Sequence, residues 1–123
     1  MICKTINVLE NKIFGMKKKD ALIRATANGL LRPMVMWILS KKAHSGYSIM
    51  KEIRRITGIN YHAGIIYPLL YSLEGEGLIT GRWRTSGRRN IKDYSLTPEG
   101  ISAFKMIRKF LSSSLREMHD LVE

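Results

Sequence analysis

The sequence predicts a mainly helical α+β domain, with three helices, a two-stranded hairpin and a long C-terminal helix. Two observations lead to this fold class. Apolar residues recur at helical spacing up to about residue 76 and again after residue 98, whereas residues 78–96 follow a period of two. Gly, Pro and hydroxyl residues stand where the pattern changes. With 123 residues, of which 45% are apolar, the chain has the size and composition of one globular domain, with or without an accessory segment.

The N-terminal residues predict an amphipathic helix outside the main domain. Over residues 2–14, apolar side chains at spacings of four, three and four share one helical face, and they are Ile2, Ile6, Leu9 and Ile13. A glycine and three lysines then break the pattern. We therefore expect an extension over 1–16, a main domain over 17–97 and a separate terminal helix over 98–123.

The main domain is expected to contain a buried helix followed by two short amphipathic helices. Residues 20–27 are expected to be helical, and the apolar run that begins at residue 30 predicts a buried helix reaching about residue 42. Ser45 can cap the second helix, which ends at Gly58, and its apolar stripe is Tyr47, Ile49, Met50, Ile53 and Ile56. The third helix spans about 62–76 and faces the core with Ile66, Leu70 and Leu73.

A hairpin and a long helix complete the expected order of elements. Residues 78–84 and 90–96 predict two strands, joined by a loop over 85–89. Thr97-Pro98-Glu99 is a strong helix start, because a capping hydroxyl precedes a proline and an acid at the positive end of the helix dipole. The last helix is expected to run nearly to the C-terminus.

The net charge of +11 points to a polyanionic partner, most often nucleic acid. Residues 98–123 carry equal numbers of acids and bases, so the first 97 residues hold the whole excess. Between Arg82 and Lys92 there are five bases and no acid. The alternative for such a stretch is a solvated basic surface.

Two short helices followed by a basic hairpin describe a winged helix-turn-helix, which suits double-stranded DNA. The third helix fits the major groove, and the second braces it. Bases expected to face phosphates are Lys51, Arg54 and Arg55 in the second helix, and Arg82, Arg84, Arg88, Arg89 and Lys92 in the hairpin. Residues expected to face outward from the third helix or just before it are Tyr61, His62, Tyr67, Tyr71 and Ser72.

The aromatic candidates have structural alternatives. Tyr67 and Tyr71 share a helix face, so a half-buried pair is equally consistent with their spacing. We expect His62 to lie near a phosphate rather than to read a base, and Trp83 to belong to the core of the hairpin rather than to stack on DNA.

The last helix carries a heptad seam with one polar interruption, formed by Phe104, Ile107, Leu111, Ser114, Met118 and Leu121. A small domain has little core of its own left for such a face, so we expect a two-fold dimer through Phe104, Ile107, Leu111, Met118 and Leu121. The alternative is that this face packs on the first helix of the same chain.

Three motifs resemble the PadR family of transcriptional regulators: HSGYSIMKEI at 44–53, GIIYPLLYSLEGEGLI at 64–79 and YSLTPEG at 94–100. The resemblance implies a homodimeric winged-helix repressor that binds a palindromic operator in duplex DNA and dimerises through its C-terminal helices. It also implies that the hairpin and the start of the third helix meet DNA, the latter through Ala63, Gly64, Ile65 and Tyr67. Ile65 departs from the family, where Thr or Ser is common, and lacks their hydroxyl.

The family resemblance also raises the question of a small aromatic effector. Members with a short C-terminal helix can bind flat aromatic compounds at the dimer interface. The last helix offers Phe104 and Phe110 but no tryptophan as walls for such a pocket.

The sequence does not favour an enzyme. Cys3 is the single cysteine, and His44, His62 and His119 lack a metal-ligand spacing as a set. No uncharged apolar run approaches the ~20 residues that cross a bilayer. We therefore expect a cytoplasmic, nucleoid-associated protein without cofactor or metal. A non-specific architectural DNA-binding protein and a module that binds another protein are the alternatives to a sequence-specific regulator.

Overall fold

A computed structural model describes residues 18–122. The chain divides into two compact units, Met1–Leu31 and Arg32–Glu123, and the domain bounds expected at residues 16 and 97 stay predictions. Within the first unit, residues 18–29 are helical, which confirms the helix expected over 20–27. The predicted helix over 2–14, with its apolar stripe, lies outside the described residues.

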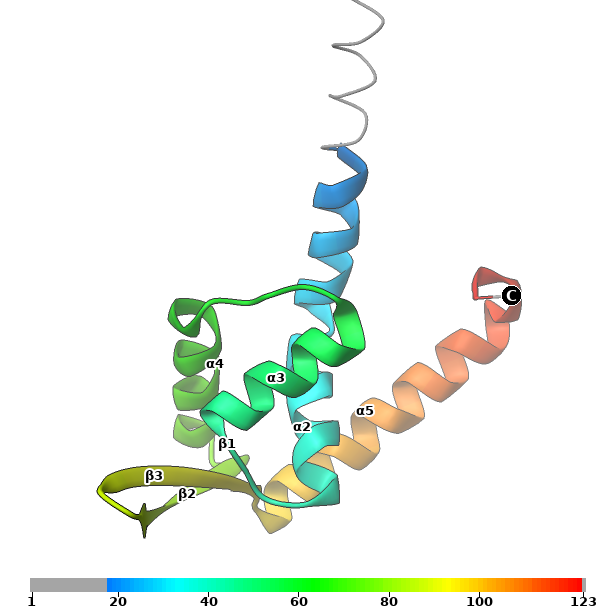
Figure 1. Ribbon diagram of the computed structural model, residues 1–123. Helices are drawn as coiled ribbons and strands as arrows, with labels where there is room; N and C mark the ends of the chain where they lie inside the picture. Colours follow the sequence, from blue (N-terminus) through cyan, green and yellow to red (C-terminus); the bar gives the residue numbers. More distant parts are fainter. Residues whose placement is uncertain (1–17, 123) are drawn as a thin grey trace, which may run out of the picture. The chain divides into compact units, whose positions relative to one another are not determined.

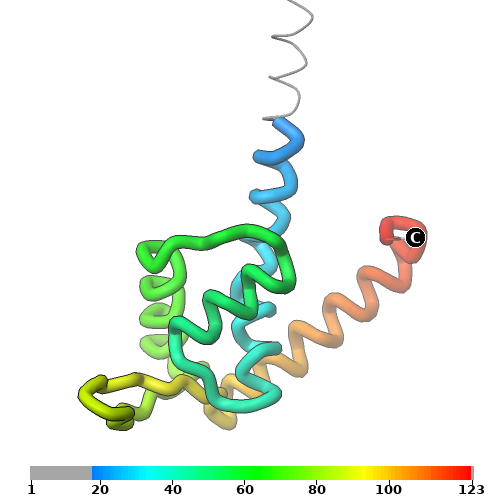
Figure 2. The backbone as a smooth tube through the Cα atoms, in the orientation of Figure 1, coloured from blue at the N-terminus to red at the C-terminus, as the bar shows by residue number. Residues whose placement is uncertain are grey.

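The remainder of the chain is the predicted mainly helical α+β fold, shown in Figure 1. Its elements are α2 (Leu31–Lys41), β1 (His44–Ser45), α3 (Gly46–Thr57), α4 (Ala63–Gly75), β2 (Ile79–Ser86), β3 (Arg89–Leu96), α5 (Pro98–Glu117) and a 3-10 turn (His119–Leu121). Figure 2 shows the chain leaving α3 and entering α4 through residues 58–62, so that the two helices cross instead of forming one continuous rod.

Local hydrogen bonds explain where the helices begin and end. The Ser45 hydroxyl accepts a hydrogen bond from the Ser48 N–H at 3.1 Å and so caps α3. Gly58 ends α3 in the left-handed conformation at φ +74°, which glycine adopts without steric cost. The Thr97 hydroxyl accepts from the Gly100 N–H at 3.0 Å and starts α5. The three predicted boundaries are confirmed.

The core lies between α2, α3 and α4 and is closed by the base of the hairpin. The predicted apolar face of α4 is fully buried, and α3 contributes Ile49 and Ile53. Other buried side chains of the core are Val35, Met36, Ile38, Leu39, Ile79, Tyr94 and Phe104. Tyr47 is exposed, because the buried face of α3 runs through Gly46, Ile49 and Ile53 and Tyr47 lies one residue off it.

The hairpin differs from the prediction in its length and in its partner. Its strands pair from Ile79↔Leu96 to Ser86↔Arg89, so the turn consists of only two residues, Gly87 and Arg88. Gly87 has φ +62°, which suits the first position of a tight hairpin turn. Residues 44–45, expected as a loop, form β1 and pair with β3, which gives a three-stranded sheet in the order β1-β3-β2.

The last helix is shorter than expected and partly used by its own chain. α5 ends at Glu117, and a 3-10 turn follows. Phe104 is buried within the single chain, so its side chain completes the protein's own core and is not free for the predicted dimer seam. Ile107 and Leu111 are half-buried, whereas Met118 and Leu121 are exposed.

Candidate nucleic-acid interface

The first turn of α4 is open to solvent and carries no acidic side chain. His62 occupies the capping position, but its side chain makes no capping hydrogen bond. His62, Ala63, Gly64 and Ile65 are all exposed. Small residues at this end let the helix backbone approach a surface closely, and backbone N–H groups at a helix N-terminus favour negative charge. This turn can therefore approach a phosphate or the floor of a groove.

The side chain of Tyr67 is held against the start of α3. A Cβ added to Gly46 would lie 2.7 Å from the Tyr67 ring and 2.9 Å from its hydroxyl oxygen, so only glycine leaves room for this ring. Tyr67 is half-buried as a result, whereas Tyr71, one turn later on the same side of α4, stays exposed. The two tyrosines are therefore not an equivalent pair.

The solvent exposure of two aromatic side chains differs from the expectation. Tyr61 is only 4% exposed, so it is a core residue in this structure and presents little surface to DNA. Trp83 is 70% exposed, so the prediction that it forms the core of the hairpin is wrong. The strand alternation does place Trp83 and Tyr94 on one face of the sheet, but the helices cover only Tyr94.

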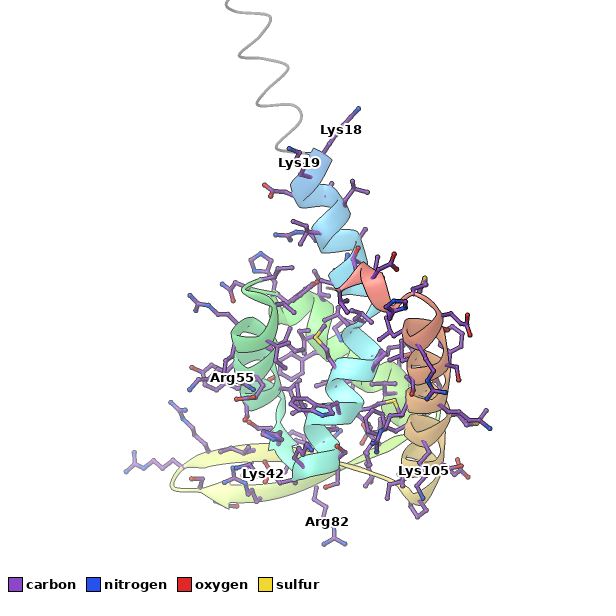
Figure 3. The ribbon with its side chains drawn as sticks, turned by 90° about the vertical axis from the view of Figure 1, so that its right-hand side faces the viewer. Lys18, Lys19, Lys42, Arg55, Arg82 and Lys105 are labelled. Carbon is purple, nitrogen blue, oxygen red and sulfur yellow. The ribbon has the colours of Figure 1, made fainter. Side chains whose placement is uncertain are left out.

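The basic residues of the hairpin fall into two groups. Arg84 forms an ion pair with Asp93, and Lys92 forms one with Glu74. The other three bases make no ion pair with any residue in the described range, and they are Arg82, Arg88 and Arg89. Figure 3 shows the Arg82 side chain pointing away from the helices. Arg88 lies in the turn itself and Arg89 directly beside it, so the tip carries unpaired positive charge.

Glu74 ties α4 to both strands of the hairpin, which sequence reasoning missed. Its carboxylate accepts from the Lys92 ammonium at 2.8 Å and from the Gly81 N–H at 3.0 Å. The Lys92 side chain crosses directly over Gly81, where an added Cβ would collide with Lys92 Cε. The hydrogen bond from Glu74 raises the pKa of Lys92 above its ordinary value. Lys92, predicted to face phosphate, is therefore already partnered.

The exposed side of α3 adds further positive charge. Lys51 and Arg54 are exposed, as predicted, and the Lys51 ammonium lies 5.6 Å from the centre of the Tyr47 ring. Arg55 instead pairs with Glu52 at 2.8 Å, and this hydrogen bond lowers the pKa of the Glu52 carboxyl. Figure 3 shows Arg55 on the α3 side of the molecule and Lys105 on the α5 side.

Two features are absent from the described part of the chain. Over residues 18–122, no group of three or more His, Cys, Asp or Glu side chains is arranged to hold a metal ion. None of the helices in that range is both long and apolar enough to pass through a membrane.

The fold and these surfaces define a winged helix-turn-helix protein, in which α3 and α4 form the helix-turn-helix and β2–β3 the wing. Residues 35–106 match the model of the transcriptional regulator PadR-like family, and the chain belongs to that family. Its family is one of transcriptional regulators and not of enzymes.

Curated and solved relatives agree with this assignment. The transcriptional regulator YqjI of Escherichia coli is 37% identical over 79 residues, which is 63% of this chain and 37% of YqjI. The chain thus matches little more than a third of that relative's length. A PadR family transcriptional regulator from Eggerthella lenta has a TM-score of 0.74 at 25% identity, covering 90% of this chain and 97% of its own.

One solved relative contains DNA. Bacillus subtilis PadR, in complex with operator DNA, has a TM-score of 0.57 at 30% identity, over 62% of this chain and 45% of that one. The matched portion of this chain is thus similar to part of a protein that binds an operator.

Proposed function

We propose that the protein is a homodimeric, sequence-specific regulator that binds duplex DNA and acts as a repressor. This proposal rests on one observation. The open first turn of α4 and the unpaired arginines of the wing tip belong to the same winged helix-turn-helix. Figure 1 shows α4 and the hairpin on one side of the fold and α5 on the other. The operator complex of Bacillus subtilis PadR supports the same partner. The site of action is then the chromosome in the cytoplasm.

The set of residues proposed to contact DNA is smaller than the set that the sequence indicates. The first turn of α4 enters the major groove, where Ala63 and Gly64 permit close approach and Ile65 offers a methyl surface suited to thymine. Phosphate contacts come from Lys51 and Arg54, together with Arg82, Arg88 and Arg89 of the wing.

Selection of bound fragments from genomic DNA by the purified protein tests sequence specificity. The proposal expects one enriched palindrome, with half-site centres roughly 34 Å apart, about one duplex turn. Enrichment of random fragments at physiological salt contradicts the proposal and favours a non-specific architectural protein.

The role of the wing is tested by Arg88→Ala, with Lys105→Ala on α5 as a control of equal charge. Because each subunit of the proposed dimer loses one side chain that binds a phosphate, the slope of log affinity against log salt becomes shallower by about 1.8, and binding to operator and random duplexes weakens alike. Lys105→Ala is expected to leave both quantities unchanged. Equal effects of the two variants would show that only overall charge matters.

Dimerisation is proposed to use the exposed apolar side of α5 and the turn after it. Beyond the half-buried Ile107 and Leu111, this surface is formed by Met106, Phe110, Leu115, Met118 and Leu121. Phe110 is 68% exposed in the single chain, so Phe110→Asp leaves the protein's own core intact. We expect this variant to sediment as a monomer, and Ser112→Asp, which adds the same charge on the opposite side of α5, to sediment as a dimer. A dimeric Phe110→Asp protein rules out this seam.

A further inference from the structure

A cleft of about 470 Å³ opens between the start of α3, the wing-facing side of α4 and the hairpin. Five aromatic side chains line it, namely Tyr47, Tyr67, Tyr71, Trp83 and Tyr94. They come from four different elements, and the pairing of β1 with β3 brings the start of α3 to the hairpin. The cleft therefore depends on tertiary structure and has no continuous motif in the sequence.

Three of these rings are largely open to solvent. Tyr47 is 65% exposed, Tyr71 59% and Trp83 70%. Aromatic side chains usually bury most of their surface because their apolar area is large. A group of exposed rings around one concave site is typical of an interaction surface.

The charge around the cleft is positive. Arg89 and Lys92 line it, and none of the described lining residues is Asp or Glu. Lys92 is paired with Glu74, which does not belong to the lining, so Arg89 supplies the unpaired positive charge of the lining. Lys51 adds a further ammonium beside the Tyr47 ring. The occupant favoured by this surface carries both negative charge and flat aromatic groups.

Duplex DNA supplies negative charge through its phosphates, but the flat faces of its bases are stacked on one another and are not accessible to a protein ring. Unpaired bases expose their faces, and a positive groove with aromatic platforms is how proteins bind single strands without reading sequence. The cleft volume lies within the range of ~300–1,000 Å³ in which small ligands are enclosed. A single unpaired nucleotide and its neighbours therefore suit this site better than a paired helix does.

We propose that this cleft binds single-stranded nucleic acid, with an unpaired base stacked on Trp83 and Tyr71 and the adjoining phosphates near Arg89 and Lys51. This activity is additional to duplex binding, because the base stacks on the side of α4 that faces the wing and not at the first turn of that helix. Arg89 and Lys51 would serve phosphates in both activities.

Fluorescence of Trp83 gives a direct readout. The chain has two tryptophans, so a Trp37→Phe protein reports Trp83 alone. We expect oligo(dT) or oligo(U) to quench this emission in a saturable way. Quenching by both indicates binding of either nucleic acid, by oligo(dT) alone single-stranded DNA, and by oligo(U) alone RNA. No saturable quenching by either strand overturns the proposal.

Variants separate stacking from simple charge attraction. Trp83→Ala and Tyr71→Ala are each expected to weaken binding of the labelled single strand about tenfold or more, whereas Trp37→Phe leaves it unchanged. An abasic strand of equal length keeps the phosphates but lacks bases, and we expect it to bind at least tenfold more weakly than oligo(dT). Equal affinity for the abasic strand, or no loss in both aromatic variants, refutes base stacking.

Duplex binding by the same proteins distinguishes this proposal from the function proposed above. If operator binding persists while single-strand binding is absent, only the cleft proposal fails. If single strands bind but no operator is enriched, only the proposed repressor function fails. Far-ultraviolet circular dichroism confirms folding of each variant, which we expect because the substituted rings are exposed.

Discussion

Replacing Glu74 by alanine tests whether the contact between α4 and the wing stabilises the protein. The variant removes the acceptor of two hydrogen bonds, from Lys92 at 2.8 Å and from the Gly81 N–H at 3.0 Å. It leaves the Lys92 ammonium, whose side chain is only 19% exposed, without its carboxylate. Loss of a hydrogen bond to a charged group costs about 1.5–3 kcal/mol, and water can reach this half-buried pair. We therefore expect a loss of about 2 kcal/mol.

The matched control lies two residues further along the chain. Glu76 pairs with Arg32 at 3.1 Å, but both side chains are nearly half exposed. An exposed pair of this kind contributes about 0–1 kcal/mol. Glu76→Ala therefore removes the same charge from the end of the same helix but is expected to cost much less than Glu74→Ala.

Thermal unfolding followed by circular dichroism measures the difference. For a domain of this size, a loss of 2 kcal/mol lowers the melting temperature by roughly 8 °C, and the control variant should lie within roughly 4 °C of the parent. All proteins are compared at one concentration, because association would raise the apparent melting temperature. Equal small shifts for both variants would refute the structural role assigned to Glu74.

Two further predictions concern the core. Gly100→Ala should lower the free energy of unfolding by about 1–3 kcal/mol, because the added Cβ would collide with the Leu78 carbonyl oxygen. The control Gly75→Ala has nothing within 4 Å of the added Cβ, so its midpoint of chemical denaturation should be unchanged or higher. Equal midpoints for the two variants would contradict this packing. Burial raises the pKa of Tyr94, so the unfolded chain ionises first and stability falls as pH rises above about 10. Absorbance at 295 nm should then show a late phase of tyrosine ionisation that is absent from a Tyr94→Phe protein. A late phase that persists in that variant argues against the assignment.

The sequence by itself determined the order of elements, because the signals for them are local. Hydroxyl residues mark the starts of α3 and α5, Gly58 marks the end of α3, and the spacing of Ile66, Leu70 and Leu73 shows which side of α4 is buried. The excess of positive charge and the family motifs also lie in continuous segments. The fold class and the family were therefore predictable.

Only the tertiary structure decided how individual side chains of the interface are used. Alternation along a strand indicates which residues share a face, but it does not show how far the helices cover that face, so Trp83 is exposed while Tyr94 is buried. Composition counts the bases of the wing, but their partners come from elsewhere in the chain, as Glu74 does for Lys92 across 18 residues. The availability of a charge or a ring depends on neighbours that are distant in sequence, and folding alone brings those neighbours together.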